Sequence, residues 1–188
     1  GLVMPAAFIG QAEESGLIVP IGRWVLDAAL AQLGEWTRAG RTMRVAVNVS
    51  ARQLETGTLA AEIEAALQHY AVPPELLCLE ITEHQLVRSL EDSTRELGRL
   101  RQLGVRVALD DFGTGYSSLS YLPRLPLDGL KVDRELVMRV GGARDTVPAV
   151  LRLGRDLGLT VVAEGIETVD QLVLLRAAGC TLGQGYLL

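Results

Sequence analysis

The sequence has no hydrophobic run long enough to cross a membrane. A membrane-spanning helix needs roughly 20 consecutive apolar residues, and the apolar runs of this 188-residue chain are much shorter. The N-terminal "GLVMPAAFIG" also lacks the basic start and long apolar stretch of a secretory signal peptide. Nothing in the sequence marks the chain for export, and we expect a cytoplasmic domain that makes no membrane contact of its own.

Cysteine is scarce, and the two that occur are not arranged for metal binding. Cys78 lies in "LLCLEI" and Cys180 in "AAGCTLG", both apolar stretches, with no CxxC or Cys/His spacing. This pattern predicts two reduced thiols in the core and argues against a disulfide or a zinc site.

The chain also lacks an excess of positive charge. Its formal charge of -5 argues against a surface that binds nucleic-acid polymers. A small phosphorylated ligand held through metal ions remains compatible with it. The length and the 48% of hydrophobic residues are ordinary for one globular domain with a sizeable core.

What the chain does have is a regular alternation of short β-branched runs with longer helical patterns. One long amphipathic helix is predicted over residues 21–40, and apolar residues at three- and four-residue spacing predict helices around Leu90–Leu103 and Val147–Leu157. The predicted strands are residues 43–49, 76–82, 105–110, 128–133, 159–165 and a weaker 181–188. Gly104, Gly158 and Gly179 mark helix ends just before strands. Strands that are apolar at most positions indicate a parallel α/β sheet covered on both faces.

Each predicted strand places a polar residue in its C-terminal part. These residues are Asn48, Glu80, Asp110 with Asp111, Lys131, Glu164 and Gln184. In a parallel barrel the C-terminal strand ends open at one mouth, where such enzymes build their active sites. Each residue alone has an ordinary explanation as a cap or a loop residue, and for Asn48 or Gln184 alone that explanation is the better one. The recurrence on six strands favours a common site.

Several carboxylates at one mouth repel each other unless some are protonated or a cation binds among them. Oxygen ligands without histidine favour Mg²⁺ or Mn²⁺ over zinc. The Asp110–Asp111 pair suits two ions with one carboxylate between them. Lys131 has two readings, as a group that contacts the attacking water and as a salt-bridge partner of the carboxylates.

At these residues the chain resembles the EAL domain family, bacterial phosphodiesterases that hydrolyse cyclic di-GMP to linear pGpG. The family's motifs occur in order along nearly the whole chain, as "GLVMPAAFI", "AEESGLIVPIGRWVL", "VNVSARQ", "LEITE", "DDFGTGYSSLSYL", "LKVDR", "VVAEGIET" and "GCTLGQGY". The resemblance implies a TIM-like (β/α) barrel and an enzyme of bacterial second-messenger signalling.

The resemblance also implies roles for individual residues. Asn48, Glu80 and Asp110 match the ligands of one metal ion, and Asp110, Asp111 and Glu164 match groups around a second. Lys131 matches a lysine that contacts the attacking water, and Gln184 a polar group near the same water or phosphate. Glu83 and Glu167 match acidic residues that support the site, and "FGTGYSSLSYL" matches a loop that links the metal site to a homodimer interface.

One departure from the family concerns the Glu-Ala-Leu motif, which these 188 residues do not contain. The resemblance therefore implies an EAL domain truncated at both ends, about six strands of an eight-stranded barrel, within a longer signalling protein with a possible GGDEF or sensory domain upstream and a possible membrane anchor. We expect this chain alone to hydrolyse little. The alternative function is a cyclic di-GMP receptor without activity. A phosphosugar enzyme is a weaker third, because "GQGY" makes a poor phosphate site.

Overall fold

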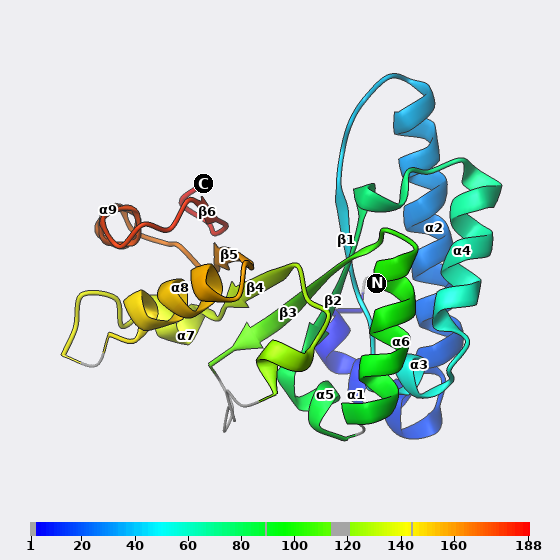
Figure 1. Ribbon diagram of the computed structural model, residues 1–188, viewed down its shortest axis with the longest axis horizontal. Coiled ribbons are helices and arrows are strands. Elements are labelled where there is room, and N and C mark those ends of the chain that lie inside the picture. Colours follow the sequence, from blue (N-terminus) through cyan, green and yellow to red (C-terminus); the bar gives the residue numbers. More distant parts are fainter. Residues whose placement is uncertain (1–2, 89, 114–120, 144) are drawn as a thin grey trace. The chain divides into compact units, whose positions relative to one another are not determined.

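The computed structural model describes residues 3–88, 90–113, 121–143 and 145–188 (Figure 1). The chain divides into two compact units. The first comprises Gly1–Ile81 and Gln85–Arg106, and the second Thr82–His84 and Val107–Leu188. Among the described residues no single helix meets the length and hydropathy needed to cross a membrane; the helices Ile9–Ser15 and Ile18–Arg38 meet them only as a pair that is bent by 118°.

The first unit combines two parallel strands with a group of long helices. Its strands pair in register from Val45 opposite Leu77 to Asn48 opposite Glu80. Its elements are α1 (Ile9–Ser15), α2 (Ile18–Arg38), β1 (Val45–Asn48), α3 (Ala51–Glu55), α4 (Leu59–Tyr70), β2 (Leu77–Thr82, which reaches the second unit) and α6 (Leu90–Gln102), with short 3₁₀ helices at Pro5–Ala7 and Pro74–Leu76. Helices α2, α4 and α6 run side by side (Figure 1).

Helix α2 shows how the apolar pattern becomes packing. Its buried residues recur every three or four positions, as predicted for an amphipathic helix, and Leu30 and Leu33 are fully buried. The helix begins at Ile18, three residues before the predicted start, because Pro20 lies in its first turn, where a missing N–H costs no helix bond. It ends at Arg38, and Gly40 turns the chain with a φ of 72°.

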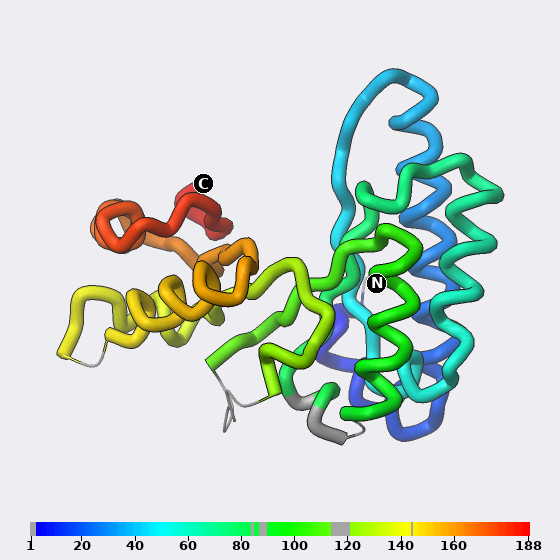
Figure 2. Tube along the Cα trace, in the orientation of Figure 1, coloured from blue at the N-terminus to red at the C-terminus, as the bar shows by residue number. Residues whose placement is uncertain are grey.

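The second unit is a four-stranded parallel sheet in chain order, β3-β4-β5-β6. Helix α5 (Glu83–Arg88) starts within it and continues in the first unit. Its other elements are β3 (Arg106–Phe112), a 3₁₀ turn (Leu122–Arg124), β4 (Gly129–Val132), α7 (Arg134–Val137), α8 (Val147–Asp156), β5 (Thr160–Ala163), α9 (Val169–Ala177) and β6 (Leu182–Gly183). The Cα trace shows the chain passing from β5 through α9 to β6 (Figure 2).

All six predicted strands exist, and the sixth is shorter than predicted. Gly104, Gly158 and Gly179 each adopt a positive φ directly before a strand, as the helix-end pattern predicts. Strand β6 ends at Gly183 because the chain then turns, with the Leu188 amide donating to the Gly185 carbonyl. The sequence predicts strands that are covered on both faces. Strands β3 and β4 have no exposed residue and fit this prediction, whereas β1, β5 and β6 each contain exposed residues.

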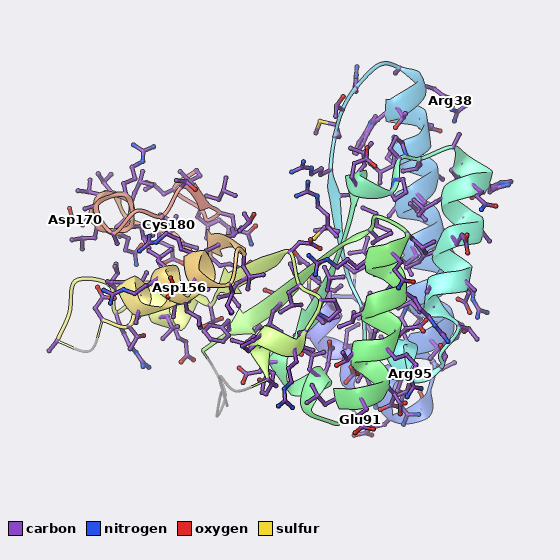
Figure 3. All side chains as sticks on the ribbon, viewed as in Figure 1. Arg38, Glu91, Arg95, Asp156, Asp170 and Cys180 are labelled. Carbon is purple, nitrogen blue, oxygen red and sulfur yellow. The ribbon has the colours of Figure 1, made fainter. Side chains whose placement is uncertain are left out.

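Both cysteines are thiols outside any disulfide, as predicted. Cys180 is buried between α9 and β6 (Figure 3), and its thiol donates to the Leu182 carbonyl at 3.2 Å. Charged side chains concentrate instead on helix surfaces such as that of α6, where Glu91 and Arg95 extend from the first turns (Figure 3). Cys180 therefore belongs to the folded core, whereas Cys78 is half-buried.

Candidate metal centre at the strand ends

The two adjacent aspartates lie at a bulge in β3. Leu109 pairs with Leu130 and Phe112 with Val132, so three steps along β3 are matched by two along β4. Asp111 takes up the extra residue with a φ of 54°, in the left-handed region that few residues other than glycine adopt. Consecutive strand residues normally point to opposite faces. The bulge breaks this alternation and changes the direction of a side chain at the end of the strand.

This distortion brings both aspartates to a third carboxylate. Oxygen atoms of Asp110, Asp111 and Glu164 all lie within 4.8 Å of one another. Glu164 follows β5 directly, and its amide continues the ladder by donating to the Val132 carbonyl at 3.0 Å. Asp110 is further fixed through its Oδ1, which accepts the Asp111 amide at 3.0 Å. Three carboxylates from two strand ends therefore converge, as the strand-end pattern predicts.

Lys131 provides a positive charge among them. It lies in β4, the strand between β3 and β5, and its Nζ is 3.1 Å from Asp110 Oδ1 and 2.6 Å from Glu164 Oε1. Its side chain is 10% exposed, so these ion pairs are only weakly screened by water. Among these four groups one ammonium faces three carboxylates, so together they carry a net negative charge. The site retains the charge that would attract a divalent cation.

Gln184 joins the cluster from the turn after β6. Its Nε2 donates to Glu164 Oε1 at 2.6 Å, the same oxygen that faces Lys131. Both contacts orient one carboxylate oxygen of Glu164. Carboxylate oxygens in this number suit a hard divalent ion, Mg²⁺ or Mn²⁺, better than zinc.

The family profile of the EAL domain matches residues 1–188, the whole chain. The chain belongs to the EAL domain family.

The chain is similar to several curated relatives and solved structures. It is 44% identical over 191 residues to the cyclic di-GMP phosphodiesterase NbdA of Pseudomonas aeruginosa, matching 100% of this chain and 24% of that protein. It is 40% identical over 190 residues to the cyclic di-GMP phosphodiesterase PdeR of Escherichia coli, matching 100% of this chain and 29% of that protein. A structure of the PaMucR phosphodiesterase with c-di-GMP aligns with a TM-score of 0.92 and 42% identity, covering 100% of this chain and 77% of that one.

The likeness to PaMucR confirms the predicted fold class of this EAL domain. EAL domains are TIM-barrel-like, and the described part of the chain carries six strands and intervening helices of that fold. The chain spans less than a third of the length of the curated relatives named here.

Two predicted metal ligands of the EAL domain lie in the first unit. Asn48 and Glu80 are opposite each other at the ends of the paired strands β1 and β2, and the Val49 amide donates to the Glu80 carbonyl at 2.9 Å. Asn48 is exposed and Glu80 half-buried. Their pairing brings one amide and one carboxylate together, and their assignment to a metal stays a prediction.

Glu83 is placed differently from the carboxylates at the strand ends. It begins α5, is 3% exposed, and its Oε1 accepts the Tyr121 hydroxyl at 2.8 Å. Burial, then the hydrogen bond to Glu83 and the charge of that carboxylate, raise the pKa of Tyr121 well above its usual range. This contact anchors the chain just after residues 114–120, so it fits the support role implied for Glu83. Tyr116 and most of the "FGTGYSSLSYL" segment lie outside the described residues.

Glu167, the other predicted supporting acid, forms an ion pair of 3.0 Å with Arg134. Arg134 starts α7, and its side chain lies beside Gly165, the residue after Glu164. The sequence reading did not identify Arg134, because its neighbours in "KVDR" mark only the end of a strand and the helix N-cap Asp133. The position of an arginine beside Gly165 depends on packing between two strand-end loops.

Proposed function

We propose that this EAL domain hydrolyses cyclic di-GMP to linear pGpG, with Mg²⁺ or Mn²⁺ as the metal. The observation that carries the proposal is the convergence of Asp110, Asp111 and Glu164 beside Lys131. It is supported by relatives named as cyclic di-GMP phosphodiesterases and by the similarity to the PaMucR complex with c-di-GMP. With this substrate, a cytoplasmic location and a role in bacterial signal transduction follow.

In this proposal Asp110, Asp111 and Glu164 hold a divalent ion, and Asn48 and Glu80 are ligands of a second one. A divalent ion bound by carboxylates supplies positive charge to the phosphate and makes a coordinated water more acidic. The donor set fits this role because it consists of hard oxygen ligands gathered at one point.

The protein's own groups orient the reaction. Gln184 and Lys131 both contact Glu164 Oε1, which fixes the rotation of that carboxylate. As an ammonium, Lys131 would donate a hydrogen bond to a water beside the carboxylates and hold it, and only its neutral amine form would accept a proton from that water. Its ion pairs with Asp110 and Glu164 keep it near them before substrate arrives. Glu83 accepts the Tyr121 hydroxyl and supports the site through that contact.

The test measures hydrolysis and binding separately. Cyclic di-GMP is incubated with Mn²⁺ and with this chain, or with a version extended upstream through a Glu-Ala-Leu strand, and pGpG is quantified by chromatography. We expect turnover by the extended version that Asp110→Asn removes, while the matched change Asp156→Asn on the exposed surface of α8 leaves it unchanged.

Calcium distinguishes a receptor from an enzyme in the same assay. Ca²⁺ accepts oxygen ligands at longer distances and in higher coordination than Mg²⁺. We therefore expect it to support cyclic di-GMP binding, measured by calorimetry, and to stop turnover. Binding with Mn²⁺ and no pGpG from the extended version would identify a receptor. Full turnover with Ca²⁺ as the only divalent ion would contradict the proposed metal chemistry.

The proposal includes a homodimer formed through the "FGTGYSSLSYL" region. Of its two tyrosines, Tyr121 is half-buried and bonded to Glu83, so it also serves the packing of the second unit. Sedimentation velocity over a range of protein concentrations tests the dimer. A monomer at high concentration with full activity would remove it.

A further inference from the structure

The turn after β6 lies directly against the turn after β5. The Gln184 amide donates to the Ala163 carbonyl at 2.9 Å, and the Ile166 amide donates to the Gln184 carbonyl at 3.1 Å. The Leu187 amide then donates to the Ile166 carbonyl at 3.1 Å. The parallel pairing of β5 and β6 therefore continues past the strands, over the residues that follow Glu164.

Gly185 makes this contact possible. A Cβ at Gly185 would overlap the amide nitrogen and carbonyl oxygen of Ile166 and would lie 2.7 Å from its carbonyl carbon. These are backbone atoms, and a bond rotation cannot move them away. Ile166 is itself held, because its side chain is 2% exposed in the core. Any side chain at position 185 must therefore push the two turns apart.

Gly183, two residues earlier, approaches the same residue in another way. A Cβ there would overlap Cδ1 of Ile166, the far end of a side chain. The next atoms are the Ala163 carbonyl oxygen at 3.4 Å, which is an ordinary van der Waals contact, and Cγ1 of Ile166 at 3.7 Å. Relief of that overlap needs a shift of a side-chain tip and no displacement of backbone atoms. The two glycines thus form a natural pair, in which one added methyl group meets backbone and the other meets a side-chain tip.

The turn contact bears on Glu164 because both turns carry a partner of the candidate site. Gln184 immediately precedes Gly185, and its side chain donates to Glu164 Oε1 at 2.6 Å. Glu164 is separated from Ile166 by Gly165 alone, which has a φ of 67°. Moving the turns apart would lengthen the Gln184–Glu164 bond and release a group that orients the carboxylate.

We propose that Gly185 is a positioning residue for Glu164. Its missing side chain lets the backbone of residues 184–187 dock on Ile166, and this docking sets the direction of the Glu164 carboxylate toward Asp110, Asp111 and Lys131. Gly185 itself touches none of the reacting groups. The inference deepens the proposed metal site, but its first test needs neither metal nor substrate.

Lys131 is the only lysine of the sequence, so it reports on Glu164 without further labelling chemistry. Its Nζ is 2.6 Å from Glu164 Oε1, and selective ¹⁵N-lysine labelling gives one side-chain ammonium resonance. We would record this resonance in the metal-free wild type, Gly185→Ala and Gly183→Ala. We expect it to shift or broaden in Gly185→Ala and to keep its position in Gly183→Ala.

The second measurement is Mn²⁺ affinity, from the free-ion signal in electron paramagnetic resonance. Displacing a group that orients a metal ligand typically costs about tenfold or more in affinity. We expect such a loss for Gly185→Ala and a change within about twofold for Gly183→Ala. If wild type binds no Mn²⁺, the metal proposal fails while the lysine resonance still decides the role of Gly185.

A folded Gly185→Ala with the wild-type lysine resonance would overturn the inference, as would equal effects of the two alanine variants. Thermal unfolding establishes whether Gly185→Ala is folded at the temperature of the measurement. If it is not, Leu187→Pro decides, because it removes the amide that donates to Ile166 without adding bulk at position 185. An altered lysine resonance in that variant supports the inference, and an unaltered one overturns it.

Discussion

Two glutamates in different parts of the molecule each contact a cation and a neutral donor, but only one of them lies among other carboxylates. Glu96 on α6 is 2% exposed; its Oε1 accepts the Ala60 amide at 2.7 Å and its Oε2 pairs with Arg99 at 3.1 Å. Glu164 receives Lys131 and Gln184 on the same oxygen and lies among two further carboxylates.

The difference separates a structural carboxylate from a candidate ligand. Glu96 satisfies an amide in the first turn of α4, where helix N–H groups lack partners and the helix end favours negative charge. Its charge is matched by nearby donors. Glu164 is instead grouped with like charges that one ammonium does not balance. A carboxylate surrounded by donors stabilises the fold. Carboxylates grouped together repel one another, and a bound cation relieves that repulsion.

The largest expected effect comes from removing a carboxylate of that gathered group. Asp110→Asn should weaken Mn²⁺ binding by at least about tenfold and reduce hydrolysis by about a hundredfold or more, since it deletes a ligand and a negative charge. Lys131→Ala should lower turnover less and bind Mn²⁺ at least as tightly, because it removes a competing positive charge. Paramagnetic resonance and product chromatography measure the two effects. Greater damage to both by Lys131→Ala would reverse the assignment.

The same substitution in Glu96 and in Glu164 compares how much each carboxylate contributes to the free energy of unfolding. Glu96→Gln should lower the free energy of unfolding by about 2 kcal/mol, because charged hydrogen bonds of a buried group are lost. Glu164→Gln should change it by less than about 0.5 kcal/mol, since relief of repulsion offsets the weakened contact with Lys131, which keeps Asp110. Urea unfolding at neutral pH measures both. A larger loss for Glu164→Gln would mean that its contacts serve stability.

The sequence predicts much of this contrast, because periodicity and strand-end residues are local signals. The six strands, the helix-ending glycines and the polar residues at the strand ends all follow from spacing. The proximity of Asp110 and Asp111 to Glu164 also follows, since carboxyl ends of parallel strands share one edge.

The sequence does not predict the features whose geometry depends on pairing between distant segments. The bulge at Asp111 arises from the register of β3 against β4, and no residue in "VALDDF" signals a positive φ. The capping of α4 by Glu96 joins residues 36 positions apart. The docking of Gly185 on Ile166 is equally non-local; "GQGY" indicates a turn but not its partner.

A third acidic residue, Glu83, tests how much one neutral hydroxyl donor contributes at a buried carboxylate. Tyr121→Phe removes the hydroxyl that donates to Glu83 and should cost about 1 kcal/mol at neutral pH. The pKa of Tyr121 is raised in the folded state, so the stability from this contact is present below the unfolded value near 10 and is lost as pH rises through the folded value. The stability gap between wild type and variant should therefore shrink above pH 10. A gap that widens there would contradict this hydrogen bond.

The smallest effect belongs to Glu62 on α4, which makes an ion pair with Arg23 at the surface. Arg23 donates to both carboxylate oxygens, from Nε at 3.0 Å and Nη2 at 2.6 Å. This hydrogen bonding lowers the pKa of Glu62 although partial burial opposes the shift. The contribution is thus present above the unfolded value near 4.5 and is lost as pH falls through the folded value.

Because the pair is exposed, water and salt screen it, and its contribution to stability should be slight. Between pH 6 and 3 the wild type should lose slightly more stability than Glu62→Gln, and added salt should reduce the difference. Glu64→Gln, at an exposed position on the same helix, is the matched control and should follow the wild type. The midpoints of urea unfolding, measured for the three proteins across this pH range, test this prediction. If Glu62→Gln lost as much stability as Glu96→Gln at neutral pH, burial would not be what distinguishes the structural carboxylate, and good geometry alone would suffice.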